Sequence, residues 1–182
     1  MQLAPIFFSV SPRTTGARAA ATRADLAVYR FVRVRLKTAA LDGPLRALTF
    51  SGEHAAIWYA AGAVGSALDR RRRPAWRRAM QAIFVTQLLN TALKAVFRRK
   101  RPALADLPAL VPVPTSLSFP SAHAATSFCA AAAFRPLVPR GTPLRPVAAA
   151  IAFSRVYFGV HYPSDVLVGA AVGRAVAGAL KP

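Results

Sequence analysis

Residues 147–173 read VAAAIAFSRVYFGVHYPSDVLVGAAVG, two apolar segments joined by a short polar stretch. The alanine, valine and glycine of both segments predict helices that pack closely together in lipid, since small residues let helix backbones approach. Between the segments lie Arg155, His161 and Asp165. Burying such groups costs free energy unless each has a partner or a task, so the stretch predicts either a paired structural cluster or a functional site.

The rest of the chain combines high hydrophobicity with strong positive charge. Its 182 residues suffice for one domain with its own core, and 54% of them are hydrophobic, yet 25 Lys and Arg face only 6 Asp and Glu. This combination is typical of a small integral membrane protein with arginines in short loops and at the membrane surface. Binding to nucleic acid is disfavoured, because the basic clusters at 70–73 and 98–101 merely separate apolar runs. The single cysteine, Cys129, excludes an intrachain disulfide.

Apolar runs predict five helices, over about 53–68, 79–97, 121–138, 146–160 and 164–180. Asp42-Gly43-Pro44 is expected to interrupt the chain, with Ser51 capping the helix that follows. The proline-rich segment 103–118 is expected to be a loop.

An amphipathic helix is predicted at 25–37, where apolar residues share one face and Arg30, Arg33 and Lys37 another. It is too short and too charged to span a bilayer, which favours a helix lying on the membrane surface. Packing on a protein core is the alternative.

The expected fold is therefore all-α. It is an integral membrane bundle of about five membrane-embedded helices, or six if the N-terminal helix also crosses, plus that interfacial amphipathic helix. Residues 1–24 are expected to be a flexible lead-in and 25–182 one membrane-embedded domain, since 11–24 lacks hydrophobic periodicity.

Two further polar clusters precede the opening stretch. Lys94 and Arg101 lie two helical turns apart and are suited to binding an oxyanion. A basic flank of a membrane helix, with Lys94 reaching the interface, is the alternative. In FPSAH, residues 119–123, Ser121 and Ala122 are expected to offer free N–H groups at a helix N-terminus beside His123. Taken alone, that pattern is common.

The third cluster is His161 with Asp165. If a helix begins at about 162, the two side chains lie on the same side of its first turns. A carboxylate bonded to one imidazole nitrogen leaves the other nitrogen free as a nucleophile or base.

Together the three clusters resemble the signature of the type 2 phosphatidic acid phosphatase superfamily, K-x6-RP, PSGH and SR-x5-H-x3-D. The matching residues are Lys94-x6-Arg101-Pro102, Pro120-Ser121-Ala122-His123 and Ser154-Arg155-x5-His161-x3-Asp165. Every spacing within the motifs is kept, and the one departure is Ala122 in place of glycine. Alanine retains the backbone N–H, so we expect activity to survive the change. The resemblance covers about residues 94–169.

The resemblance implies a role for each residue. His161 attacks phosphorus and forms a phosphohistidine, Asp165 orients it, and His123 protonates the leaving oxygen and then activates water. The phosphate oxygens are held by Lys94, Arg101, Arg155, Ser121 and the Ala122 N–H. Because these cations neutralise the phosphate, neither a metal ion nor another cofactor is expected. His54, outside the signature, is expected to be structural or interfacial.

The implied partners are a lipid phosphate substrate and the bilayer. Within the superfamily, SGEHAAIW (51–58) and VPTSLSFPSAHAATS (113–127) are similar to the mycobacterial-type decaprenylphosphoryl-5-phosphoribose phosphatases of arabinan precursor synthesis. Phosphatidylglycerophosphate, phosphatidate and undecaprenyl pyrophosphate remain alternative substrates.

The expected location is the plasma membrane, with the site on the extracytoplasmic side. The basic residues between 13 and 46 weigh against that side by the positive-inside rule. Nothing in the sequence indicates an oligomeric state. The competing hypothesis is a non-catalytic, basic protein that binds anionic lipid at the membrane surface.

Overall fold

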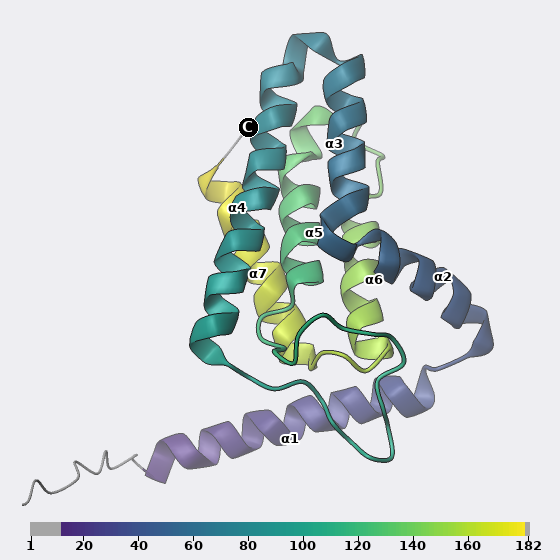
Figure 1. Cartoon of the computed structure of the whole chain (residues 1–182), viewed down its shortest axis with the longest axis vertical. Coiled ribbons are helices and arrows are strands. Elements are labelled where there is room, and N and C mark those ends of the chain that lie inside the picture. Colours follow the sequence, from purple (N-terminus) through teal and green to yellow (C-terminus); the bar gives the residue numbers. More distant parts are fainter. Residues whose placement is uncertain (1–11, 181–182) are drawn as a thin grey trace, which may run out of the picture.

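The computed structural model describes residues 12–180, with side chains from residue 22 onward. In this part of the chain the regular elements are all helices, which confirms the predicted all-α class. They are α1 (Pro12–Arg35), α2 (Ala39–Ser51), α3 (Ala56–Leu68), α4 (Arg73–Phe97), α5 (Ala122–Ala133), α6 (Leu144–Tyr157) and α7 (Pro163–Ala179), with 3-10 turns at Glu53–Ala55, Arg70–Arg72 and Arg135–Leu137. Helices α3 to α7 stand side by side as a bundle, and α1 lies across its lower end (Figure 1).

Helix α5 occupies the centre of the bundle and packs against α4, α6 and α7. Its alanine, serine and threonine side chains are nearly all buried, because small side chains allow neighbouring helices to approach from several directions. Near the C-terminal end of α5, the rings of Trp58, Trp76 and Phe134 belong to one buried cluster, with Phe134 lying 5.2 Å from Trp76 and 6.4 Å from Trp58 between ring centroids.

Helices α5 and α7 approach most closely where α7 carries Gly169 and Gly173. A Cβ atom at position 169 would lie 2.5 Å from the carbonyl oxygen of Ser121, and one at position 173 would overlap the carbonyl oxygen of Ala125. Only glycine fits at such a distance between two backbones. The close helix contact that the small residues predict is therefore present.

The expected interruption at Asp42-Gly43-Pro44 is wrong, because these residues lie inside α2. Proline lacks an N–H and so removes one helical hydrogen bond. Helix α2 nevertheless packs against α6 and buries Leu45 and Thr49, and this packing outweighs the missing bond. Ser51 does not cap the next helix either; it ends α2 and its hydroxyl donates to the carbonyl of Leu48 at 3.0 Å.

Two helices begin earlier than predicted. Helix α4 starts at Arg73 because Pro74 suits the first turn of a helix, so part of the basic cluster joins it. Helix α1 starts at Pro12, and the expected boundary at residue 24 falls inside it. Residues 1–11 lie outside the described residues, and the flexible lead-in stays a prediction.

Across residues 12–180, no helix is at once long enough and apolar enough to cross a membrane. The number of membrane-spanning helices therefore stays a prediction.

The contact between α5 and α7 can be tested with two glycines of the same helix. We expect Gly173→Ala to lower the free energy of unfolding by about 3 kcal/mol, since the added methyl group forces the two backbones apart. Gly178→Ala is the matched control, because nothing lies within 4 Å of the added atom there. It should leave the stability unchanged or raise it by up to about 1 kcal/mol through helix propensity. Equal thermal unfolding curves for the two variants would contradict the packing described.

Candidate active site

Six of the eight predicted site residues line one cavity at the end of the bundle that faces α1. The cavity has a volume of about 550 Å³, and those six are Lys94, Arg101, Ala122, His123, Arg155 and His161. They meet because the bundle brings the C-terminal ends of α4 and α6 next to the N-terminal ends of α5 and α7 (Figure 1). The segment 98–121 covers this end; it contains the predicted loop 103–118 and extends it on both sides, with only isolated bridges such as Lys100 to Leu117.

His161 is buried between a carboxylate and a guanidinium. Its Nδ1 lies 3.4 Å from Oδ2 of Asp165, and its Nε2 lies 3.0 Å from Nη1 of Arg101. If Nδ1 carries the proton and donates to the carboxylate, Nε2 holds a lone pair directed at the cavity side. Burial, together with the charges of Arg101, Arg155 and Lys94, holds the pKa of His161 well below its ordinary value. The imidazole is therefore neutral at neutral pH, as a nucleophile must be.

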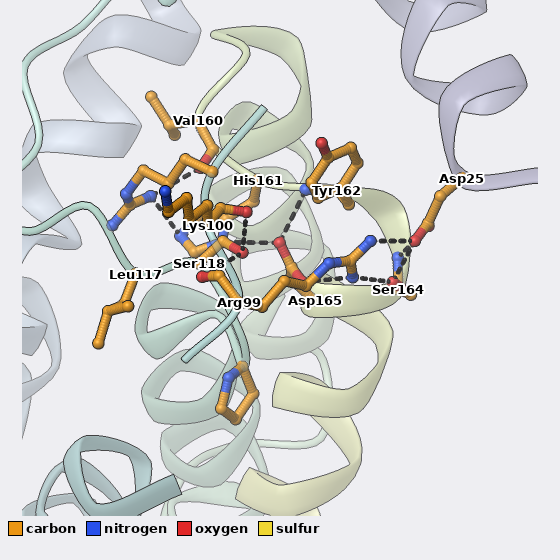
Figure 2. Close-up of polar contacts among 12 residues, drawn as sticks. Asp25, Arg99, Lys100, Leu117, Ser118, Val160, His161, Tyr162, Ser164 and Asp165 are labelled. Atoms are coloured by element: carbon orange, nitrogen blue, oxygen red, sulfur yellow. Dashed lines mark hydrogen bonds and ion pairs between the residues drawn. The ribbon is translucent and has the colours of Figure 1, made fainter. Parts of the chain in front are cut away.

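Asp165 is completely buried behind His161 and does not line the cavity. Its Oδ2 also accepts the N–H of Tyr162 at 2.9 Å, and its Oδ1 accepts a hydrogen bond from Nη1 of Arg99 at 2.8 Å (Figure 2). These bonds fix the carboxylate at the first turn of α7, where the helix dipole stabilises negative charge.

Backbone carbonyl groups, most of them in the covering segment, hold two of the cations. The Nζ of Lys94 donates to the carbonyls of Leu117 at 3.0 Å and Ser118 at 3.2 Å. Arg101 donates from Nε to the carbonyl of Thr115 at 2.8 Å, and from Nη1 to that of Val160 at 2.6 Å. Because carbonyl oxygens carry no net charge, both side chains keep their positive charge free for an anion.

Thr49 of α2 contacts both Arg155 and His123, and its place in the site was not predicted from the sequence. Its hydroxyl oxygen accepts a hydrogen bond from Nη1 of Arg155 at 2.5 Å. Its carbonyl oxygen lies 3.1 Å from Nε2 of His123, which is consistent with a proton on that nitrogen. The Nε of Arg155 is buried and has no hydrogen-bond acceptor among the described residues.

The expected pair of free N–H groups at 121 and 122 is only partly present. The N–H of Ser121 donates to the carbonyl of Asp165 at 2.9 Å, so that backbone group is not free. The reason is the close approach of α7, which brings the backbone of residue 165 against the start of α5. Ser121 does not line the cavity, although its hydroxyl is buried without a hydrogen-bond partner among the described residues. Ala122 lines the cavity in the first turn of α5, where N–H groups have no acceptor within the helix.

Two more residues that contact the site were missed, Asp25 and Arg99. Arg99 was counted only as a member of the basic cluster at 98–101, yet its guanidinium joins Asp165 to Asp25 of α1. The available signal was the scarcity of acidic residues: with only 6 in the chain, a carboxylate at the start of a basic helix calls for an explanation. His54 was expected to be structural or interfacial, and it lies exposed on the wall of the cavity.

The chain is similar to known proteins both in sequence and in fold. A family model described as the PAP2 superfamily matches residues 75–181. The decaprenylphosphoryl-5-phosphoribose phosphatase of Mycobacterium tuberculosis strain H37Rv is 37% identical over 164 residues, which are 86% of this chain and 88% of the relative. The protein of the same name from Mycolicibacterium smegmatis is 38% identical over 126 residues, 68% of each chain.

Two solved structures share the fold. Aquifex aeolicus LpxE superimposes with a TM-score of 0.70 at 25% identity, covering 85% of this chain and 92% of its own. The first transmembrane PAP2 type phosphatidylglycerolphosphate phosphatase from Bacillus subtilis gives a TM-score of 0.73 at 23% identity, covering 88% and 84%. The resemblance noted in the sequence is thus confirmed.

The hydroxyl of Thr49 can be tested by its removal. We expect Thr49→Val to lower the free energy of unfolding by about 2 kcal/mol, because Nη1 of Arg155 loses its buried acceptor. Thr49→Ser keeps the hydroxyl and should cost only about 1 kcal/mol for the lost methyl group. Chemical denaturation of the three proteins measures the difference, and a valine variant no less stable than the serine variant would contradict the assignment.

Proposed function

This chain belongs to the PAP2 superfamily, and from that premise we propose that it is a metal-independent lipid phosphate phosphatase acting through a phosphohistidine. The catalytic residues in this proposal are His161, Asp165 and His123. The residues that bind the phosphate are Lys94, Arg101, Arg155 and the N–H of Ala122, with the hydroxyl of Ser121 as an additional donor.

One observation carries the proposal: three cations and a neutral histidine line one cavity, and the histidine nitrogen that is not bound to Asp165 contacts one of those cations. Arg101 lies 3.0 Å from Nε2 of His161, and Lys94 and Arg155 line the same space. Among the described residues, the carboxylate that contacts His161 is paired with Arg99, and Glu53 is the one carboxylate on the cavity wall, so three cations against one anion leave the cavity positive. A phosphate group would supply acceptors for these cations, including the unpaired Nε of Arg155.

The proposed chemistry transfers the phosphoryl group twice. Nε2 of His161 attacks phosphorus while the bond to the leaving oxygen breaks, and His123 gives that oxygen a proton. A water molecule, deprotonated by His123, then attacks the phosphohistidine and releases inorganic phosphate. The cations stabilise the charge on the equatorial oxygens in both steps, a task that metal ions perform in other phosphatases. Asp165 holds the imidazole in the required orientation and stabilises its positive charge.

For the substrate we propose a polyprenyl-linked sugar phosphate such as decaprenylphosphoryl-5-phosphoribose, following the names of the relatives. Beyond the phosphate-binding residues, the cavity wall carries polar side chains that suit the hydroxyl groups of a sugar. They are Glu53, His54, Gln87 and Asn90. Phosphatidylglycerophosphate, phosphatidate and undecaprenyl pyrophosphate are the alternatives.

We propose that α3 to α7 are embedded in the plasma membrane and that α1 lies on its surface. The solved relative from Bacillus subtilis is described as transmembrane. Helix α4 exposes large apolar side chains along its length, among them Phe84, Leu88 and Val96. Such side chains suit contact with lipid, and α1 has the crosswise orientation of a helix at the membrane surface (Figure 1).

Phosphate release by the purified protein tests the enzyme. We expect it to hydrolyse lipid phosphates in the presence of a chelator, with decaprenylphosphoryl-5-phosphoribose preferred over the three alternatives. His161→Ala should abolish turnover, and Asp165→Asn should lower kcat by roughly 10³ to 10⁴-fold, because the carboxylate no longer fixes the imidazole. Asp69→Asn, at the opposite end of the bundle, is the control and should retain full activity. Undiminished activity of His161→Ala would overturn the mechanism, and no activity on any substrate would favour the non-catalytic lipid-binding hypothesis.

For the orientation, we propose that the site faces the extracytoplasmic side, which leaves the arginines at 70–78 and 135–145 in the cytoplasm. A cysteine placed at Ala105 in the covering segment, in a Cys129→Ser background, should react with a membrane-impermeant thiol reagent in intact cells. A cysteine at Arg71 should react only after lysis. The opposite labelling pattern would place the site in the cytoplasm.

A further inference from the structure

We infer that Asp25 of α1 and Arg99 of the covering segment are positioning residues for the nucleophile, acting on His161 through Asp165. This inference rests on the proposed phosphatase function and adds to it a connection from the helix at the end of the bundle to the reacting nitrogen. Neither Asp25 nor Arg99 belongs to the signature that identifies the family.

The guanidinium of Arg99 is held on several sides. Its Nη2 donates to Oδ2 of Asp25 at 2.7 Å, and its Nη1 donates to Oδ1 of Asp165 at 2.8 Å. The same Nη1 lies 2.7 Å from the hydroxyl oxygen of Ser164, and the guanidinium carbon lies 4.1 Å from the ring centre of Tyr162. Figure 2 shows the guanidinium between the two carboxylates. An arginine bound in this way has one available orientation, and it fixes the carboxylate of Asp165 from the side opposite His161.

Asp25 is bound as firmly at its own end. Its Oδ1 accepts the N–H of Ser164 at 2.9 Å, and its Oδ2 accepts the hydroxyl of the same serine at 2.5 Å. The carboxylate thus binds the first turn of α7, where a negative charge is stabilised by the helix dipole. Burial raises the pKa of Asp25, but the hydrogen bonds from Ser164 and Arg99 outweigh it and lower the pKa below its ordinary value. Asp25 is therefore ionised at neutral pH.

Arg99 compensates the buried negative charge of Asp165. Asp165 is completely buried, and a buried carboxylate without a cation is strongly disfavoured. If a cation of the cavity paired with Asp165 instead, its charge would no longer be available to bind the phosphate. Arg99 approaches from outside the cavity and does not line it, so it compensates Asp165 while Lys94, Arg101 and Arg155 remain available.

A second ion pair between α1 and the covering segment provides a matched control. Arg30 of α1 binds Asp106 at 2.5 Å, and both side chains are about half exposed. This pair fastens the same helix to the same segment but makes no contact with Asp165. If Asp25 served only to attach α1, removing either carboxylate would have a similar effect on catalysis.

The test is steady-state phosphate release by single and double variants, with their unfolding midpoints measured in parallel. We expect Arg99→Gln to lower kcat about 100-fold and Asp25→Asn about tenfold, with little change in KM, because the imidazole is misplaced while the phosphate-binding cations remain. Arg99→Lys should recover part of the kcat lost in Arg99→Gln, since it restores a cation beside Asp165. Asp106→Asn should change kcat by less than about twofold, as exposed ion pairs contribute little.

The double variant Asp25→Asn with Arg99→Gln separates positioning from attachment. If Asp25 acts through Arg99, the double variant should be no slower than Arg99→Gln alone. The inference is overturned if the losses of kcat in the two single variants multiply in the double variant. It is also overturned if Asp25→Asn and Asp106→Asn lose the same kcat, or if the kcat of Arg99→Gln stays within about twofold of wild type. If Arg99→Gln does not fold, the same cycle is built on Arg99→Lys. An inactive wild-type protein would instead refute the proposed function, which keeps the two failures distinct.

Discussion

The close approach of α7 to α5 is the contact on which the site depends. Gly169 and Gly173 let the two backbones meet, and the carbonyl of Asp165 then accepts the N–H of Ser121. The N-terminal ends of both helices are thereby held together. His123 lies in the first turn of α5, and His161 lies two residues before the start of α7. The one backbone contact between Ser121 and Asp165 therefore sets the relative position of both histidines.

Charge is distributed unevenly around that contact, and the imbalance suits a phosphate. On the far side of His161, Asp165 is paired with Arg99, and Arg99 with Asp25. On the cavity side, Lys94 binds neutral carbonyls, Arg101 binds carbonyls and the neutral imidazole of His161, and Arg155 binds a threonine hydroxyl. Neutral partners fix a cation in place without cancelling its charge. Asp165 and Asp25 therefore lie behind His161, whereas the cavity in front of it is lined by three cations and one carboxylate, Glu53, and keeps a net positive charge.

Much of the fold and the site was predictable because the relevant patterns are local. The helices that contain the signature follow from apolar runs, and the spacing from His161 to Asp165 places the two on one side of a helical turn. The errors arose where packing overrides local preference. Pro44 lies within α2 because the helix is held by its contact with α6. The N–H of Ser121 is not free because it donates to the carbonyl of Asp165 in α7, a contact between residues far apart in the sequence.

The sequence by itself determined the all-helical class, the family and the set of residues that we propose bind and attack a phosphate, since residue type and short spacing encode these. Only the tertiary structure decided which neighbours hold those residues. Thr49 and Arg99 carry no distinguishing local pattern, and the rarity of acidic residues marks Asp25 without naming its partner; the three reach the site from α2, the covering segment and α1. The physical reason is that hydrogen bonds and charge pairing depend on distance in space, which short-range sequence patterns do not specify.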